Sequence, residues 1–357
     1  EWLNQKRTEE KPFLLMVQHK APHRSWMPAL RHLPLYDDIE IPEPPTLFDK
    51  WTDNAPGARL QELEIDRHMD LNYDLFVDLT PGFHQERSQK AQDRSAWRNM
   101  KRMTPNQINT WRSHYEPRDA AFKKAKLSAK DLVRWKFQRY AKNYLRCVKG
   151  VDESLHTLQE ELKKLGLDKN TIVIYSSDQG FYIGDHGWYD KRWMYEESLK
   201  MPLIVKWPGT IKAGSKQEEM VQNLDYAQTF LDLAGAPQPK DMQGRSIVPL
   251  LKGEKLDNWR KEIYYHYYEY PSVHMVPRHY GIRTNRYKLM HFYEFGDEWE
   301  MYDLKKDPDE VTNIYGKEEF LELQKSLKKK LKNLQKFYDD QSDISVRPEY
   351  IEKYRKK

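Results

Sequence analysis

Two short polar segments of this sequence each follow an apolar run and could carry chemistry. The first, His19-Lys20-Ala21-Pro22-His23, comes directly after the run 13–18. The second begins at Asp178 and Gln179, after the run 171–176, and extends to Lys191. In open α/β sheets, ligands gather beyond the carboxyl ends of the strands. If both runs are strands of one sheet, the two segments therefore meet at one edge of it.

Asp178 and Gln179 place a carboxylate beside an amide carbonyl. Such oxygen ligands suit a hard cation such as Ca²⁺ better than zinc, which prefers His and Cys. Two ligands cannot hold such an ion, so further ligands must come from elsewhere. The alternative is a turn that closes the strand, with Gly180 at a positive φ.

His19 and His23 have the spacing of a helical metal-binding pair. Pro22 disfavours a helix at the residue before it, so a loop that presents one or both imidazoles is predicted instead. The alternative is that both are loop histidines bonded to backbone carbonyls. Residue type alone does not separate the two interpretations.

Lys191 lies among aromatic residues, close in sequence to the candidate cation ligands. A cation in that setting could bind sulfate or phosphate. The alternative is a solvated surface pair with Asp190. His186, between Asp185 and Gly187, could bind a ligand or merely belong to a turn.

The elements that must position these residues follow from hydrophobic periodicity. Apolar residues recur at steps of three and four from Val133 to Leu165, which predicts one long helix or two in succession after a capping sequence at Ser128. The runs 13–18, 171–176 and 202–206 read as strands, and 224–234 as a helix. Apolar strands that alternate with helices predict an α/β fold with a mostly parallel sheet sandwiched by helices.

From about residue 260 the pattern changes to short Tyr-rich strands. They span 263–270, 280–284, 287–293 and 300–304, and Thr284-Asn285-Arg286 marks a hairpin turn. An apolar stripe from Phe320 to Phe337 predicts one helix. The sequence thus predicts an α/β domain at 1–257, a small antiparallel sheet with a helix at 258–340, and a loose tail at 341–357. Residues 58–127 have a weak pattern and are predicted to form loops and short helices.

Composition narrows the possible functions. The 357 residues include 38% apolar and 32% charged residues, with a net charge of +5, which is well short of what nucleic-acid binding requires. A lone cysteine, Cys147, excludes an internal disulfide and is predicted to be a buried structural thiol. No apolar run is long enough for a membrane span, and no signal peptide is visible. The oligomeric state is open.

The order and wording of these motifs resemble the formylglycine-dependent sulfatases of the alkaline phosphatase superfamily. Residues 176–187, with Lys191 and Tyr195-Glu196, look like the family's second metal-binding segment, and residues 19–23 are similar to its strand-end histidine motif. Residues 201–209, 221–235, 243–251 and 300–310 continue the match. The resemblance implies a sulfatase-like fold that is incomplete in this chain.

By this resemblance, Asp178 and Gln179 are two ligands of a catalytic Ca²⁺, although Gln replaces the more frequent Asn or His. His23 and Lys191 would contact the sulfate and help to protonate the departing alcohol. His186 would lie near the substrate, with His19 in a supporting role. The family's nucleophile is a formylglycine made from Cys/Ser-x-Pro-x-Arg, a motif absent from these residues. The resemblance therefore implies a nucleophile encoded upstream.

The amino-acid sequences at 21–26 and 190–196 look most like those of N-acetylglucosamine-6-sulfatases, with iduronate or uronic-acid 2-sulfatases as alternatives. A sulfated oligosaccharide, glycosaminoglycan or mucin glycan is the expected substrate, and Arg283 on a Tyr-rich strand is a candidate sugar contact. Family habit implies a periplasmic or secreted location. Two other functions stay open. The first is a metal-dependent phosphohydrolase of the same superfamily, whose zinc sites require more Asp and His ligands. The second is a catalytically incomplete remnant that binds sulfated glycans.

Overall fold

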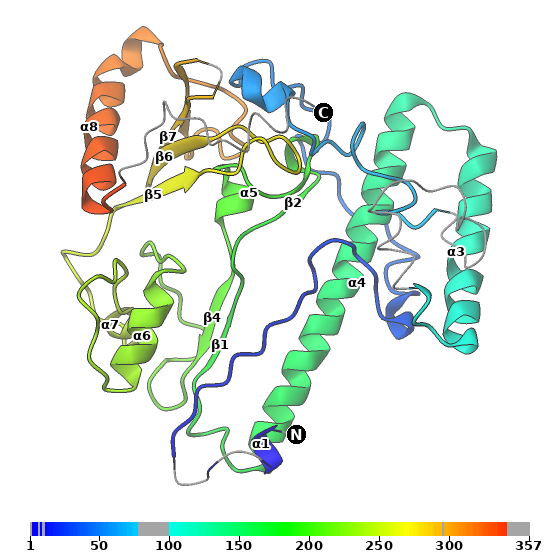
Figure 1. Ribbon diagram of the computed structural model, residues 1–357, viewed down its shortest axis with the longest axis horizontal. Helices are drawn as coiled ribbons and strands as arrows, with labels where there is room; N and C mark the ends of the chain where they lie inside the picture. Colours follow the sequence, from blue (N-terminus) through cyan, green and yellow to red (C-terminus); the bar gives the residue numbers. More distant parts are fainter. Residues whose placement is uncertain (1, 6–7, 9–10, 78–99, 295, 341–357) are drawn as a thin grey trace. The chain divides into compact units, whose positions relative to one another are not determined.

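The computed structural model describes residues 2–5, 8, 11–77, 100–294 and 296–340 of the chain (Figure 1). It contains two compact units. The first comprises residues 1–40, 70–126 and 138–158, and the second comprises residues 41–69, 127–137 and 159–357. The division at residue 257 made from the sequence remains a prediction, and the tail at 341–357 lies outside the described residues.

The first unit is helical in its described part. It holds α1 (Trp2–Gln5), η1 (Leu30–His32), α3 (Pro105–Ala125) and the middle of α4 (Ala129–Lys164). The 21-residue helix α3 corrects, for residues 105–125, the prediction of loops and short helices at 58–127; residues 78–99 of that stretch lie outside the described residues. Thr104 caps it in a reciprocal capping box with Gln107. Its aromatic side chains pack into a core made of Leu33, Phe76, Met100, Trp111 and Tyr115.

Helix α4 confirms the long helix predicted from the three-four spacing, and it is a single helix of 36 residues. The Ser128 hydroxyl accepts a hydrogen bond from the backbone N–H of Asp131, which satisfies one of the free donors at the helix start. Gly166, two residues past the end, has a φ of 67°. This left-handed conformation suits glycine and lets the chain leave the helix.

The predicted strand at 13–18 is wrong for the described structure. The segment has no regular secondary structure, and its apolar side chains are exposed, for example Leu14 at 64% and Met16 at 63%. Every strand of the described residues belongs to the second unit, so no strand within the first unit pairs with this segment. An apolar run alone does not make a strand without a neighbour to bond.

The parallel arrangement predicted for the next two strands is also corrected. β1 (Val173–Ser176) and β4 (Leu203–Lys206) are strands as predicted, but they pair antiparallel, with Val173 opposite Lys206. The connection between them, residues 177–202, is long enough for the crossover that a parallel pair needs, but it holds no long crossover helix. It contains only the short elements β2 (Tyr182–Ile183), η3 (Asp185–Gly187), β3 (Tyr189–Asp190) and α5 (Glu196–Leu199).

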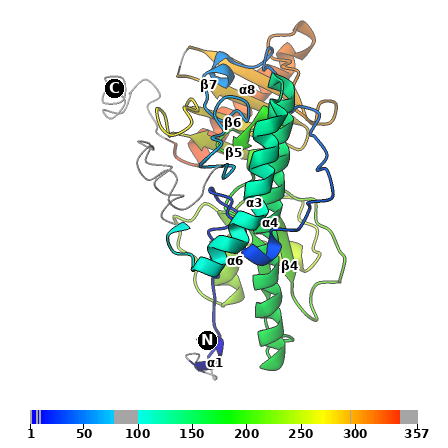
Figure 2. The same ribbon diagram turned by 90° about the vertical axis from the view of Figure 1, so that its right-hand side faces the viewer.

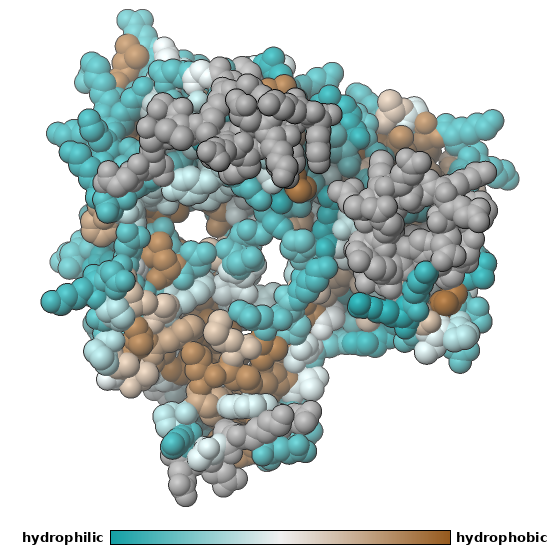
Figure 3. All heavy atoms as spheres, viewed as in Figure 1, coloured by the Kyte–Doolittle hydropathy of each residue, from teal (hydrophilic) through white to brown (hydrophobic). Residues whose placement is uncertain are grey.

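The predicted antiparallel sheet with one helix is confirmed. Its strands lie in the order β5 (Glu262–Tyr267), β6 (His279–Thr284), β7 (Tyr287–Phe292) and β8 (Glu298–Asp303). Helix α8 (Leu321–Phe337) packs across the sheet (Figures 1 and 2). Its outer side is covered by hydrophilic side chains, seen at the left of Figure 3.

Shorter elements complete the second unit. They are η2 (Pro56–Arg59), α6 (Asp225–Leu233), α7 (Val248–Leu251) and η4 (Glu318–Phe320). Helix α6 confirms the helix predicted at 224–234. Within the described ranges, no helix combines the length and apolar character that crossing a bilayer demands.

Candidate active site

The segment between Gly184 and Arg192 carries two of the predicted site residues and has an unusual backbone. His186, Asp190 and Arg192 have φ angles of 54°, 74° and 100°, although none is glycine. Such left-handed residues cost roughly 1–3 kcal/mol each and persist only where the surroundings fix them. Thr46 accepts a hydrogen bond from the His186 backbone N–H at 2.8 Å, and the Trp51 indole donates to the His186 carbonyl at 2.9 Å.

The imidazole of His186 is buried between two carboxylates. Its Nδ1 lies 3.4 Å from Asp49 Oδ2, and its Nε2 lies 3.8 Å from Glu197 Oε2. The ring also stacks on Tyr195, with centroids 4.9 Å apart. His186 is 0% exposed in this structure, so its predicted contact with substrate stays a prediction.

Asp49 and Glu197 raise the pKa of the His186 imidazole. Burial lowers the pKa of His186, but the hydrogen bond to Asp49 and the charge of Glu197 outweigh burial and leave the pKa raised. Burial raises the pKa of Glu197 to about 7, even though His186 opposes the rise. The pair can therefore hold or release a proton near neutral pH, as acid–base groups in active sites do.

Lys191 is held by its neighbour Asp190. The Lys191 ammonium lies 3.4 Å from Asp190 Oδ1 and 5.6 Å from the centroid of the Phe181 ring. The side chain is only 10% exposed, so the pair is buried and not the solvated surface pair considered from the sequence. A buried ammonium of this kind can bind an anionic group more strongly than an exposed one can.

Asp190 binds two basic side chains besides Lys191. Its carboxylate also contacts Arg192 at 2.6 Å and His274 at 3.3 Å. Burial would raise the pKa of Asp190, but the His274 hydrogen bond and the charges of Arg192 and Lys191 hold it well below its usual range. Asp190 thus holds two permanent cations, Lys191 and Arg192, close together, and the only other carboxylate that pairs with them among the described residues is the exposed Glu269, 3.9 Å from Arg192. The buried side of this group is therefore suited to an anionic ligand.

Asp178 and Gln179 follow β1, as predicted. Asp178 is exposed, accepts a hydrogen bond from the Ser177 hydroxyl at 3.2 Å, and forms no ion pair with any residue the structure describes. Its oxygens are therefore available, and their chemistry fits a hard divalent cation. No group of three or more His, Cys, Asp or Glu side chains able to hold a metal occurs within the described ranges. These two residues would be part of a ligand set.

Gly180 fixes the backbone just after these ligands. It does not have the positive φ considered from the sequence. Its N–H donates to the Ser198 carbonyl at 2.8 Å, and a Cβ there would overlap the carbonyl oxygens of Glu197 and Lys200. Glycine is required because α5 approaches closely, which ties the cation ligands to the helix that carries Glu197.

The two histidines of the first segment lie in the other unit. His23 Nδ1 donates to the carbonyl of Arg24 at 2.8 Å, and His19 Nε2 lies 2.8 Å from the Ser154 hydroxyl on α4. The bond of His23 is the backbone bond considered from the sequence, and it leaves Nε2 unprotonated when the imidazole is neutral. The expectation that both segments meet at one edge stays a prediction.

Arg283, the candidate sugar contact, lies on β6 and forms ion pairs with Glu196 at 3.0 and 3.2 Å. Glu196 also pairs with Lys288, whose ammonium reaches Glu310 at 2.7 Å. The Arg283 guanidinium is thus engaged in a partly buried ion network beneath α5, and its role in sugar binding remains a prediction.

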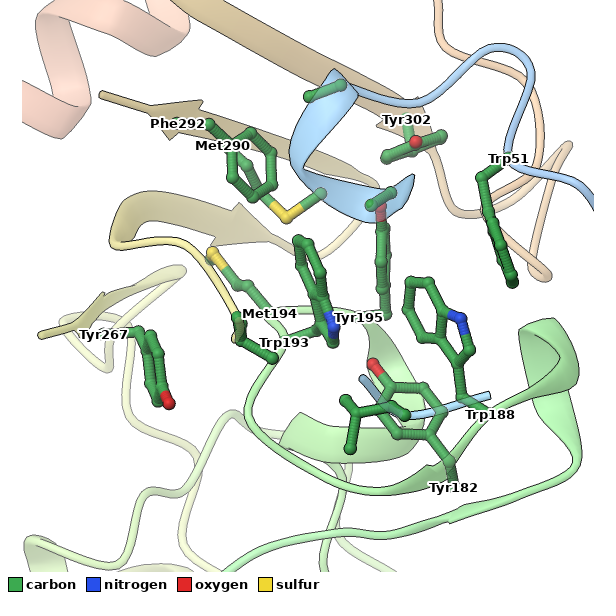
Figure 4. Packing of buried hydrophobic residues seen from close by; sticks show 14 residues of the cluster. Trp51, Tyr182, Trp188, Trp193, Met194, Tyr195, Tyr267, Met290, Phe292 and Tyr302 are labelled. Atoms are coloured by element: carbon green, nitrogen blue, oxygen red, sulfur yellow. The ribbon is translucent and has the colours of Figure 1, made fainter. Parts of the chain in front are cut away.

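A cluster of aromatic side chains forms the wall behind the Gly184–Arg192 segment (Figure 4). Trp188 stacks on Trp193 with ring centroids 5.2 Å apart and on Trp51 at 5.5 Å. All three are buried, with Tyr182 and Tyr195 packed beside them. This packing holds the backbone that carries His186 and Lys191.

Sequence reasoning missed Asp49 and Glu197. Asp49 lies in a Pro-rich stretch without a pattern. His274 was considered only as a possible part of the sugar pocket, and its contact with Asp190 was not predicted. The adjacent pair Glu196-Glu197 was a signal, but only Glu196 was used. Contacts over more than 130 residues, such as that between His186 and Asp49, leave no spacing to read.

Comparisons with known proteins place this geometry among sulfatases. A family profile described as "Sulfatase" matches residues 1–236, and one described as "N-sulphoglucosamine sulphohydrolase, C-terminal" matches residues 184–337. The chain is 46% identical to an N-acetylglucosamine-6-O-sulfatase of Bacteroides thetaiotaomicron over 94% of its own length and 59% of that protein. It is 35% identical to human arylsulfatase K over 54% of the chain and 36% of that protein.

A solved structure described as BT4656 in complex with its substrate D-glucosamine-2-N,6-O-disulfate is also similar. It is 44% identical, with a TM-score of 0.91 over 97% of this chain and 69% of that one. The chain spans about three-fifths of the length of the Bacteroides N-acetylglucosamine-6-O-sulfatase to which it is similar. These comparisons confirm the sulfatase-like fold implied by the motifs.

Proposed function

Since this chain belongs to the sulfatase family, we propose that the protein hydrolyses sulfate esters of a glycan, with 6-O-sulfated N-acetylglucosamine as the favoured substrate. The observation that carries the proposal is the similarity over 97% of the chain to a structure solved with a sulfated glucosamine. The 46% identity to an N-acetylglucosamine-6-O-sulfatase supports the same substrate class. The location expected of this family supports a periplasmic or secreted location for the protein.

The family uses a formylglycine nucleophile and a divalent metal, for which we propose Ca²⁺. The metal would lower the pKa of the nucleophile and offset charge on the sulfuryl oxygens when bound. Asp178 and Gln179 would supply two of its oxygen ligands. The nucleophile is expected from residues upstream of the printed sequence, because Cys/Ser-x-Pro-x-Arg does not occur within it.

The residues of this chain would bind the sulfate group and protonate the departing sugar oxygen. Lys191, fixed by Asp190, would bind a sulfuryl oxygen and stabilise the charge that develops there. His23, with Nδ1 bonded to the Arg24 carbonyl, would give the Nε2 proton of its imidazolium form to the departing sugar oxygen, since an alkoxide is a poor leaving group. His186, with Asp49 and Glu197, would orient the sugar or the backbone that carries Lys191.

The test is sulfate release by the full-length protein with its formylglycine installed. We expect activity on 6-O-sulfated N-acetylglucosamine, loss of activity with a chelator, and recovery with Ca²⁺. Lys191→Ala should lower kcat by about 10²-fold or more, whereas Lys261→Ala, which changes an exposed lysine, should not.

Other outcomes would point elsewhere. Hydrolysis of phosphate esters that zinc restores and calcium does not would favour the phosphohydrolase reading. Glycan binding without any sulfate release by a protein with formylglycine installed would favour the binding remnant. Faster turnover of a 2-O-sulfated uronic acid would overturn the proposed substrate.

A further inference from the structure

The exposed side of α8 carries a dense stripe of positive charge. Between Leu323 and Tyr338 the helix has six lysines and no acidic residue. They are Lys325, Lys328, Lys329, Lys330, Lys332 and Lys336. All except the partly buried Lys328 are exposed. The apolar residues of α8 face the sheet, where Leu327 and Leu331 are buried, and the lysines occupy the outer side, where Figure 3 shows hydrophilic side chains.

The six lysines differ in the partners that they have among the described residues. Lys325 pairs with Glu322 at 2.7 Å and Lys330 lies 3.6 Å from Glu262. Lys329, Lys332 and Lys336, in contrast, form no ion pair or side-chain hydrogen bond with any described residue. We call these three residues the α8 stripe.

The α8 stripe has the geometry of a linear anion site. Its members are three and four residues apart, so they lie one above another on a single helix face. At 1.5 Å per residue they span about 10 Å along the axis. Like charges at these spacings destabilise a helix by about 0.2–0.5 kcal/mol per pair, so the stripe does not serve the stability of α8. A polyanion along the helix would relieve this repulsion.

The α8 stripe is separate from the candidate active site. Alternate side chains of a strand point to opposite faces of a sheet. Tyr280, Ile282, Leu289 and Met301 pack against α8. Met290, Phe292 and Tyr302 point the other way, into the aromatic cluster of Trp193 and Tyr195 beside Lys191. The sheet thus lies between the stripe and the segment that carries Lys191.

The face of the helix around the stripe favours one class of polyanion. Between Lys325 and Lys336 its exposed uncharged side chains are those of Ser326 and Asn333. The exposed apolar side chains of α8 lie at its two ends, Leu321 at 44% and Phe337, next to Lys336, at 68%. One ring at the helix end supplies neither the row of rings on which successive nucleic-acid bases stack nor an apolar face that could enter a lipid surface. A sulfated polysaccharide requires neither, because its binding can rest on charge and on hydrogen bonds from ammonium groups.

We propose that the α8 stripe is an exosite for a sulfated polysaccharide, which holds the polymer at a place distinct from the site of hydrolysis. The choice of polymer rests on the proposed function. The ammonium groups of Lys329, Lys332 and Lys336 contact successive sulfates, and the counterions released from the polymer drive the binding.

The test compares two triple variants of the full-length protein. The first carries Lys329→Gln, Lys332→Gln and Lys336→Gln, which removes charge at nearly equal helix propensity. The control carries Lys212→Gln, Lys216→Gln and Lys240→Gln, three exposed lysines elsewhere in the same unit. Both lose the same net charge. Heparin is the probe, and its affinity is measured as a function of salt.

We expect the stripe variant to bind heparin at least about tenfold more weakly, with a salt slope lowered by about one per lysine. The control should bind like the parent, and all three proteins should hydrolyse a sulfated monosaccharide equally. Equal losses in both variants, no heparin binding by the parent, or equally tight binding of duplex DNA or phosphatidylserine vesicles would each overturn the proposal. Failure of the proposed function is distinguishable, since it would abolish monosaccharide hydrolysis and leave heparin binding intact.

Discussion

Replacing Glu197 by glutamine should reveal the cost of its buried carboxylate. Glu197 lies on α5, 3.8 Å from the His186 ring, and its Oε2 is buried without a hydrogen-bond partner among the described residues. Burial raises the pKa of Glu197 from 4.5 to about 7. Between these two values the folded protein holds a proton that the unfolded chain has released. Stability from this group is therefore fully present below pH 4.5 and is lost as pH rises through about 7.

The size of the effect follows from the pKa. A rise from 4.5 to about 7, at about 1.36 kcal/mol per pH unit, corresponds to at most about 3 kcal/mol in the free energy of unfolding. His186 titrates with Glu197 and loses an anionic partner in the variant, so part of the gain is offset. Glutamine resembles the protonated acid. We expect Glu197→Gln to match the parent near pH 4.5 and to be about 1–2 kcal/mol more stable at pH 8.

The assay is urea unfolding of both proteins at half-unit steps from pH 4.5 to 8, with the midpoint and slope fitted at each step. Glu322→Gln is the matched control, because this carboxylate on α8 is 86% exposed. Its stability difference from the parent should stay within about 0.5 kcal/mol at every pH. A difference between Glu197→Gln and the parent that does not grow with pH would refute the reasoning, and so would a variant that is less stable at pH 8.

Three further substitutions test other parts of the structure. Lys288→Met leaves the carboxylate of Glu310 buried without its cation, while Glu196 keeps Arg283, and urea unfolding should show a loss of about 3–5 kcal/mol. Gly180→Ala forces α5 away from the end of β1, so calorimetric titration of the full-length protein should show weaker Ca²⁺ binding by tenfold or more, together with a lower Tm. Gly150→Ala lies within α4 with its nearest atom 3.9 Å away, and it should raise the unfolding free energy by about 0.5–1 kcal/mol.

Elements with a strong local period could be predicted from the sequence. The alternation of Tyr-rich strands 287–293 and 300–304 places one set of side chains under α8 and the other in the aromatic cluster, as β7 and β8 do. The hairpin at Thr284-Asn285-Arg286 could also be predicted, because its signal lies within a few neighbouring residues. Helix α3 could not be recognised, since few of its residues are apolar and Pro117 lies inside it. Its capping box at Thr104 and Gln107 and the proline at the first helical position, Pro105, were the local signals available.

Long-range pairing could not be predicted. The run 13–18 and the strand β1 look alike in sequence, but only β1 has a neighbour in the described structure, β4, with which it forms a ladder. The direction of that pair depends on how the chain returns from β1 to β4. Neither property is contained in the apolar runs themselves, because a strand is defined by bonds to another segment.

In the candidate site, too, the residues could be recognised from the sequence, but their arrangement in space could not. The resemblance of residues 176–191 to a sulfatase motif was sufficient to recognise the segment, yet its shape is imposed from elsewhere in the unit. A Cβ on Gly184 would lie 2.8 Å from the Phe137 ring, and Thr46 and Trp51 hold the backbone of His186 by hydrogen bonds. These distant contacts outweigh the cost of left-handed residues at His186, Asp190 and Arg192. The strained backbone in turn brings the Asp190 carboxylate to the ammonium of Lys191. Since the contacts that hold the strain lie in residues 41–69 and on α4, substitutions there should disturb Lys191 without touching it.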